Sequence, residues 1–246
     1  MHGSDAPCPQ ATLGRLAMTV CPFRVAGQVS SSDRQGFDRR WYAPNLHMVF
    51  TPFNDDEVLA AAQYICEQPN IDPGAVQITS GRHCYEGFVY NENTLFIIDV
   101  TGLRDFGWNA DDGYYIGVGY GNWDMYRMFN NAWGRTLPAG SCYSVGLGGH
   151  ITGGGYVMLS RFHGLTIDHL TGVDIVAFPS GLPKLVHCSL TENPDLFWAI
   201  RGGGGGNFGI ITKYYFKDPP RAPEFMYTSA ITINWDGLVP KISSTS

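Results

Sequence analysis

The chain has 246 residues, of which 44% are hydrophobic and 15% are charged. This composition supports a buried core and excludes an intrinsically disordered chain, and the length suits one large domain or two small ones. Because 22 acidic residues outnumber 16 lysines and arginines, the formal net charge is −6. A negative chain binds nucleic acids and anionic membranes poorly, and no apolar run reaches the ~20 residues of a membrane span. We therefore expect neither kind of partner.

The amino-terminal end carries no secretory pattern, since no basic start is followed by a sustained apolar stretch. This favours a cytoplasmic location, although the compartment itself is left open. Residues 1–40 are poorly patterned and are predicted to form an arm. The first predicted helix lies within residues 51–69, where Asn54 can cap the amino end and Glu57 stands at the capping-box position.

Further elements are predicted from apolar periodicity and from turn residues. The expected elements are strands at residues 75–79, 94–100 and 114–120, a helix at 123–134 capped by Asn122, a hairpin that joins 173–178 to 182–190, a helix that starts near Pro194, and a strand after the glycine run at 202–206. This order of helices and strands predicts a mixed α+β domain built in layers.

The chain is unusually rich in glycine, with 31 residues, which is about 13% against an average near 7%. Many of them gather in three segments, at residues 80–87, 140–155 and 202–209. Backbone N–H groups can cradle phosphate oxygens where no Cβ blocks the approach, so a phosphate-bearing ligand explains such segments. Tight turns and bulges of a crowded β structure are the alternative explanation.

No standard nucleotide-binding motif is present. The run GVGYGN places Asn122 where the dinucleotide fingerprint needs its third glycine, and the G-x-x-x-x-G-K-[ST] pattern is absent. A nicotinamide-dependent dehydrogenase is therefore disfavoured, and saturable binding of NADH would revive that alternative.

The six cysteines do not form a recognisable metal or disulfide framework. They stand at positions 8, 21, 66, 84, 142 and 188, and none belongs to a Cys-x-x-Cys pair. This spacing argues against structural zinc, and the density is far below that of a disulfide scaffold. Most are expected to be small buried residues or free thiols, and no metal site is predicted. Cys84 and Cys142 lie inside the glycine-rich segments.

Three long motifs give the chain a family resemblance over residues 45–220. They are ITSGRHCYEGF, GSCYSVGLGGHITGGGYVMLSR and NPDLFWAIRGGGGGNFGIIT, in this order. Together they resemble the signatures of the FAD-linked oxidases related to berberine bridge enzyme, in particular the bicovalent carbohydrate and glycopeptide hexose oxidases. The resemblance implies a PCMH-type FAD-binding domain of two α+β subdomains, here residues 41–220. It also implies that residues 221–246, with the strand-like run AITINWDGL, begin a substrate domain that is largely missing.

The resemblance implies that FAD is attached by two bonds, one to His83 and one to Cys142. An imidazole near neutral pH is a nucleophile that can add to an activated methyl group of the flavin, and a thiolate can add to the ring edge. Arg82 stands where the family has a glycine. Val145 occupies the position that is thought to gate dioxygen, and a valine there favours an oxidase over a dehydrogenase.

Cofactor binding is expected throughout the three motifs. Besides His83 and Cys142, the expected positions are Ser80, Gly81, Arg82, Cys84, Tyr85, Gly140, Ser141, Val145, Gly148, Gly149, His150, Gly153, Gly154, Gly155, Asn207, Gly209 and Ile210. For His150, contact with the cofactor and a structural hydrogen bond are equally open, and the side chain of Cys84 is expected to serve packing.

The resemblance implies an FAD-dependent oxidoreductase that takes a hydride from a CH–OH or CH–NH group. The small-molecule substrate would be a sugar or a glycosylated natural product, and dioxygen would reoxidise the flavin to give hydrogen peroxide. The catalytic base is expected from the missing carboxyl-terminal part, so it is unassigned. The alternative is a truncated, catalytically inactive remnant that keeps only the FAD-binding pocket.

Overall fold

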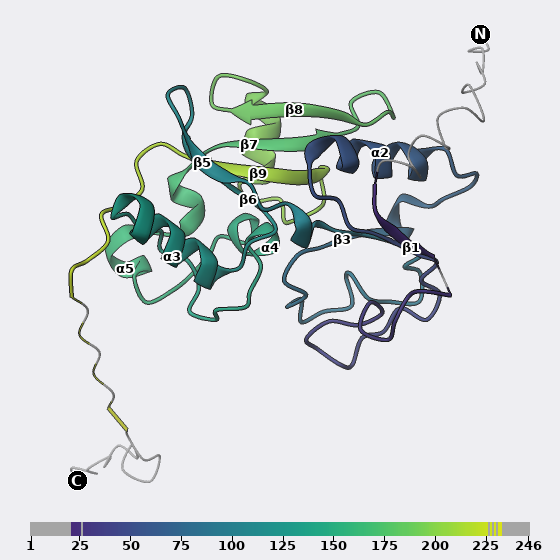
Figure 1. Ribbon diagram of the computed structural model, residues 1–246, viewed down its shortest axis with the longest axis horizontal. Coiled ribbons are helices and arrows are strands. Elements are labelled where there is room, and N and C mark those ends of the chain that lie inside the picture. The colour runs from purple at the N-terminus through teal and green to yellow at the C-terminus, as the bar shows by residue number, and fades with distance from the viewer. Residues whose placement is uncertain (1–20, 26, 226, 228, 230, 233–246) are drawn as a thin grey trace, which may run out of the picture.

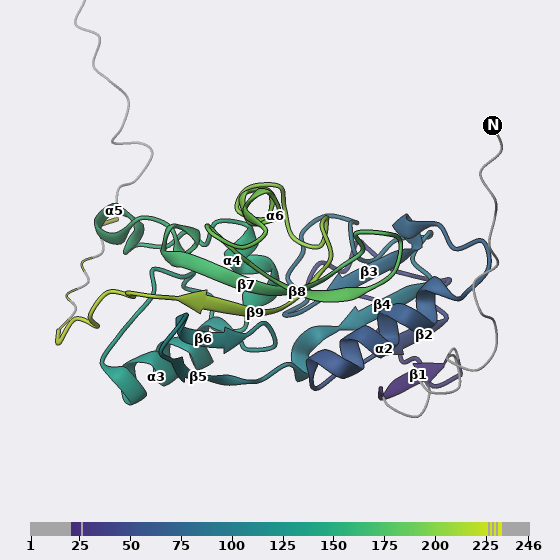
Figure 2. The same cartoon turned by 90° about the horizontal axis from the view of Figure 1, so that it is seen from above.

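The computed structural model describes residues 21–25, 27–225, 227, 229 and 231–232 (Figure 1). Cys8 and nearly all of the strand expected at residues 230–238 lie outside the described residues. The described part contains two sheets, and Figure 2 shows them one after the other along the long axis of the molecule. The mixed α+β class expected from the sequence is confirmed.

The smaller sheet has four strands in the order β1–β2–β4–β3. β1 (Phe23–Val25) pairs antiparallel with β2 (Met48–Phe50), while β2, β4 (Phe96–Asp99) and β3 (Val76–Thr79) run parallel. Every residue of β2 and β4 is buried, as parallel strands covered on both faces require. Helix α2 (Asp55–Cys66) packs against β4 and covers one face.

The amino end of α2 is built as the sequence predicts. The Asn54 side chain accepts a hydrogen bond from the Glu57 amide at 2.9 Å, and the Glu57 carboxylate accepts one from the Phe53 amide at 2.8 Å. These two bonds satisfy amides that have no partner inside the helix. They fix the start of α2 at the point where the chain leaves the small sheet.

The larger sheet has five antiparallel strands in the order β5–β6–β9–β7–β8. The strands are β5 (Phe106–Asn109), β6 (Gly113–Gly117), β7 (Leu170–Ala177), β8 (Lys184–Ser189) and β9 (Ile210–Phe216). The predicted hairpin is β7–β8, and the predicted last strand is β9. Strands β1, β2 and β5 are not among the predicted elements. The four-residue strands β3 and β4 are predicted, because each lies within a longer strand-like run, at residues 75–79 and 94–100.

Four further helices and three 3-10 turns complete the described part. They are α3 (Asn122–Trp133), α4 (Leu147–Thr152), α5 (Ser160–His163), α6 (Pro194–Ile200), η1 (Pro73–Ala75), η2 (Val100–Gly102) and η3 (Thr166–His169). The prediction that Asn122 caps α3 is wrong, because Gly121 is the cap and Asn122 is the first helical residue. The Asn122 side chain has another partner, described below.

The two sheets share one continuous core. The largest cluster of buried apolar residues runs from Val58 and Ile98 in the small-sheet half to Phe129 and Phe216 in the large-sheet half. The Phe129 ring of α3 lies 6.2 Å from the ring of Phe216, in an edge-to-face arrangement. A shared core holds the segments that connect the two halves in a fixed relation.

Part of the segment predicted to be an arm belongs to the small sheet. Residues 23–25 form β1, and Asp33 is buried against the loop that follows β3. Figure 1 shows this segment beside that loop, on the side of the small sheet away from α2. Among the described residues, no helix is long and apolar enough to cross a lipid bilayer.

Candidate functional site

Two glycine-containing loops meet backbone to backbone between the sheets. One follows β3, at residues 80–87, and the other precedes α4, at residues 140–146. A Cβ added to Gly81 would overlap the backbone amide of Gly146, and a Cβ added to Gly146 would overlap the amide of Gly81. The Ser80 hydroxyl donates a hydrogen bond to the Val118 carbonyl at 2.9 Å and fixes the start of the first loop. Only glycine at both positions permits this approach.

His83 lies where the two loops touch. Its Nε2 is 2.9 Å from the Ser144 hydroxyl, and its ring stacks on the Phe37 ring with centroids 5.0 Å apart and planes 19° apart. In the described part of the chain, no hydrogen-bond partner lies at Nδ1. One imidazole nitrogen is therefore engaged by the second loop, and the other is available for chemistry.

Cys142 is in the second loop, two residues before the serine that meets His83. The residue is exposed, and its carbonyl accepts hydrogen bonds from the Asn122 side-chain amide at 3.2 Å and from the Val145 amide at 3.3 Å. Asn122 is fully buried. Its contact with Cys142 is not predicted from the sequence, because the spacing of the two residues carries no local signal. The structure thus places His83 and Cys142 on adjoining loops.

The third glycine-rich segment lies against the same region. A Cβ on Gly205 would approach the Thr152 hydroxyl to 2.9 Å, and one on Gly206 would lie 3.6 Å from Ile78. A Cβ added to Gly148 of α4 would lie 3.0 Å from the Cβ of Ser80. The Gly148 carbonyl accepts a hydrogen bond from the Tyr214 hydroxyl at 2.8 Å. Three segments that are far apart in the sequence therefore converge on one place.

His150 has a structural partner. Its Nε2 accepts a hydrogen bond from the Gly140 amide at 2.7 Å, and burial lowers the pKa of the imidazole below its ordinary value of 6.5. The neutral ring is the form that can accept this bond. His150 therefore holds the beginning of the loop that carries Cys142, and direct contact with a cofactor stays a prediction.

The Arg82 side chain points away from the meeting point of the loops. Its guanidinium donates to the Asp99 carboxylate at 2.6 Å and to the Ser32 carbonyl at 2.7 Å. Although desolvation opposes it, the hydrogen bond with Asp99 raises the pKa of Arg82. The backbone of Arg82 has φ of 60°, the left-handed conformation that favours glycine. The glycine that the family has at this position would adopt this conformation without strain.

The remaining predicted positions have local partners, and their contact with a cofactor stays a prediction. Tyr85, Ser141 and Gly149 are exposed, whereas Ile210 is buried in β9. The Cys84 thiol donates a hydrogen bond to the Glu86 carbonyl, and the Asn207 side-chain amide donates one to the Gly203 carbonyl. Gly153 ends α4, and the backbone has positive φ at Gly154, Gly155 and Gly209, where φ is 141°.

The converging loops fit the phosphates of a nucleotide cofactor. Among the described residues, the backbone amides of Gly81, Arg82 and His83 make no hydrogen bond, so they remain available to an anion. A cleft of about 330 Å³ opens beside Gly81, and Tyr120, Trp123 and Tyr143 form part of its lining. No group of three metal-binding side chains occurs in the described part of the chain. The unpaired amides and the adjoining cleft together suit a phosphate-bearing group.

Comparison with known proteins decides the family. The sequence model of the FAD-binding domain matches residues 46–189, which include both paired loops. The chain belongs to the FAD-binding domain family. The family resemblance seen in the three sequence motifs agrees with this result, and binding of FAD by the chain follows.

Relatives and solved structures of this family include several oxidases. The chain is 47% identical over 212 residues to hexose oxidase of Chondrus crispus, covering 84% of this chain and 38% of that protein. It is similar to the structure of a glycopeptide hexose oxidase complexed with teicoplanin, with a TM-score of 0.76, 28% identity and coverage of 82% and 43%. The chain is also similar to the structure of glucooligosaccharide oxidase from Acremonium strictum, which was described with a 6-S-cysteinyl, 8α-N1-histidyl FAD. The TM-score is 0.72 and the identity is 28%, and the match covers 85% of this chain and 42% of that protein. The chain spans less than half the length of each.

The contact between the loops predicts the effect of a single methyl group. Gly81→Ala forces the loops apart, because its Cβ has no room beside Gly146. We expect a loss of about 1–3 kcal/mol in the free energy of unfolding and FAD content below a tenth of that of the unchanged protein. The control is Gly202→Ala, where a Cβ meets nothing within 4 Å. Normal stability and FAD content in Gly81→Ala would contradict the close contact.

The half-buried His150 predicts a pH dependence of stability. Because its pKa is lowered by folding, its contribution is present above pH about 6.5 and is lost as the pH falls from there towards the folded value. Urea unfolding between about pH 7.5 and pH 5 should show a steeper loss for the unchanged protein than for His150→Gln. The glutamine oxygen can accept the bond from the Gly140 amide without titrating. Equal slopes would show that His150 is not the titrating group.

Proposed function

We propose that the chain is the flavin-binding part of an FAD-dependent carbohydrate oxidase, with the flavin bonded to both His83 and Cys142. The observation that carries the proposal is the 2.9 Å contact between His83 Nε2 and the Ser144 hydroxyl. This contact brings the histidine loop to a loop whose exposed cysteine stands two residues away. The placement of both side chains on adjoining loops supports their attachment to one flavin ring system.

The backbone of the two loops would hold the non-covalent part of the cofactor. The amides of Gly81, Arg82 and His83 can donate to diphosphate oxygens, and no Cβ at residue 81 obstructs them. The Arg82 guanidinium is already engaged by Asp99, so the phosphate charge is met by N–H groups and not by that side chain. Such binding fixes the cofactor before either covalent bond forms.

The two covalent bonds join different side-chain atoms to the flavin, a nitrogen of His83 and the sulfur of Cys142. At His83, an N–C bond replaces the imidazole N–H bond and one C–H bond of a ring methyl group, and dioxygen takes the two electrons and two protons as hydrogen peroxide. At Cys142, a C–S bond replaces the thiol S–H bond and one ring C–H bond, with the same fate of the electrons and protons. His83 offers an unoccupied Nδ1 in the described structure, and Cys142 offers an exposed thiol.

The proposed reaction is oxidation of a sugar, or of the sugar of a glycosylated natural product. When bound, FAD supplies the acceptor for the hydride and passes the electrons to dioxygen. The similarity to a hexose oxidase and to a glycopeptide hexose oxidase supports this substrate class. Val145, half-buried between the Cys142 carbonyl and Asn122, is proposed to control access of dioxygen. No residue of the described chain is assigned as the catalytic base.

Two single variants and a double variant test the attachment. In protein expressed from its complete reading frame, intact mass should show one FAD per chain that survives acid denaturation. His83→Ala and Cys142→Ala should each retain FAD through the remaining bond, and the double variant should release it. Cys84→Ala, a neighbouring thiol in the same loop, is the control that keeps both bonds. A bare polypeptide in cells supplied with riboflavin would refute covalent attachment.

Peroxide release tests the substrate class. With the same protein, mono- and oligosaccharides should give hydrogen peroxide in proportion to sugar oxidised, measured by a coupled peroxidase assay. Simple alcohols of similar size serve as the comparison. Yellow protein that releases no peroxide with any sugar would overturn the oxidase proposal and favour a binding remnant.

A further inference from the structure

We propose that Phe37 is a positioning residue for His83, and that Arg82 braces the segment that carries Phe37. The proposal rests on the proposed attachment of the flavin at His83. It concerns residues 32–37, which lie within the predicted arm and outside the three motifs.

Phe37 lies flat against the imidazole. The two ring centroids are 5.0 Å apart and the planes are 19° apart, and the Tyr85 ring meets Phe37 edge-on at 6.1 Å. Phe37 is nevertheless 61% exposed, so it is not placed there by burial in the core. With Ser144 holding Nε2 and Phe37 covering one face, rotation of the His83 ring is limited from two directions.

Arg82 ties the backbone of this segment to the loop. The Arg82 carbonyl accepts a hydrogen bond from the Phe37 amide at 2.7 Å, and its guanidinium donates to the Ser32 carbonyl at 2.7 Å. Gly36 admits this contact, because a Cβ there would lie 2.6 Å from the Arg82 carbonyl oxygen. The position of Phe37 is therefore set by the residue next to His83.

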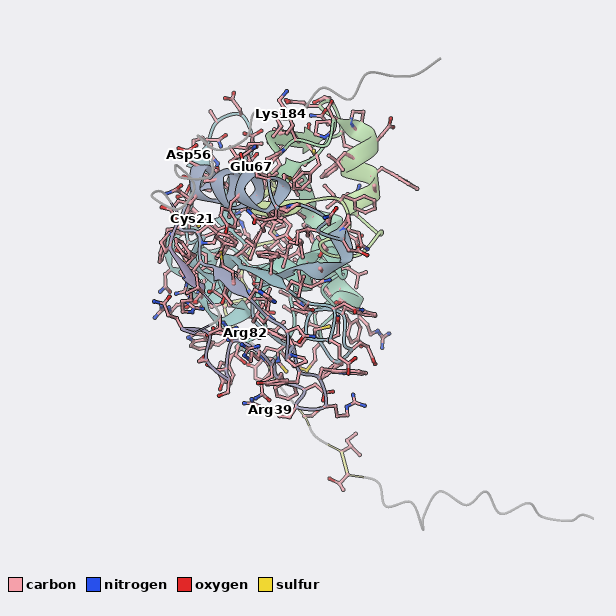
Figure 3. All side chains as sticks on the ribbon, turned by 90° about the vertical axis from the view of Figure 1, so that its right-hand side faces the viewer. Cys21, Arg39, Asp56, Glu67, Arg82 and Lys184 are labelled. Atoms are coloured by element: carbon pink, nitrogen blue, oxygen red, sulfur yellow. The ribbon has the colours of Figure 1, made fainter. Side chains whose placement is uncertain are left out.

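The brace is anchored in the small sheet. The Arg82 guanidinium lies 2.6 Å from Asp99, at the end of β4, and 3.7 Å from Asp33, and both carboxylates are buried. Asp33 also accepts from Arg24 at 2.8 Å. Figure 3 places Arg82 on the side of the strands away from Asp56 and Glu67 of α2. These ion pairs offset the unfavourable φ of 60° at residue 82, which a glycine would adopt freely.

The stacked Phe37 ring acts on one chemical step, the attachment of the flavin to His83. Attachment replaces the imidazole N–H bond and a methyl C–H bond by an N–C bond, and dioxygen accepts the two electrons and two protons. The Nδ1 lone pair must point at the methyl carbon for this bond to form. A ring held in one orientation meets that condition more often than a freely rotating one.

The test follows attachment at each residue separately. Protein from the complete reading frame, produced without riboflavin, is given FAD, and the fraction of flavin on the His83 and Cys142 peptides is followed by mass spectrometry. Phe37→Ala should slow attachment at His83 on the order of tenfold and leave attachment at Cys142 and the unfolding midpoint unchanged. Phe37→Tyr, which keeps the stacked ring, should restore the rate. Phe53→Ala is the matched control, since Phe53 is 62% exposed and has no ring contact with His83.

Three results of this experiment would contradict the role of Phe37. Attachment at His83 at the normal rate in Phe37→Ala would overturn the role of Phe37. Loss of both bonds together with loss of FAD binding would also overturn it, because Phe37 would then hold the cofactor and not the histidine. No flavin on His83 in the unchanged protein would overturn this inference and the proposed function together.

The brace is tested by Arg82→Gly. Glycine adopts the backbone conformation of residue 82 without strain but lacks the guanidinium, so His83 attachment should slow as in Phe37→Ala. A normal rate at His83 in Arg82→Gly would show that the ion pairs with Asp99 and Asp33 do not position the histidine.

Discussion

The site depends on the contact between the backbones of Gly81 and Gly146. Without a Cβ on either residue, the loop after β3 and the loop before α4 come close enough for His83 to reach Ser144. Any side chain at these two positions would separate the loops by the width of a methyl group or more. The histidine and the cysteine would then no longer face the same space.

The rest of the fold keeps that contact in register. Each loop leaves a different half of the molecule, and the shared core between the halves allows little relative movement. Local bonds then fix each loop: Asn122 and His150 hold the loop that carries Cys142, and Arg82 holds the segment that covers His83. One buried and one half-buried polar side chain, together with one ion-pair network, thus act on a site made mainly of backbone.

The sequence predicts the long periodic elements and the three motifs, because apolar spacing and glycine clusters are local signals. Helix α2 and its Asn54 cap, the β7–β8 hairpin and strand β9 are found as expected. Strands β1, β2 and β5 and the partners of buried polar groups have no such local signal. Asn122 reads as a cap and contacts Cys142, and Phe37 lies in an unpatterned segment and stacks on His83. Such contacts depend on the packing of segments that are distant in the chain.

The central claim is that one flavin joins the two loops. Proteolysis of the acid-denatured protein, followed by mass spectrometry, tests it most directly. We expect a single species in which the peptide containing His83 and the peptide containing Cys142 are joined through one FAD-derived group. Recovery of the two peptides as separate species, each unmodified or only one carrying a flavin, would contradict the account.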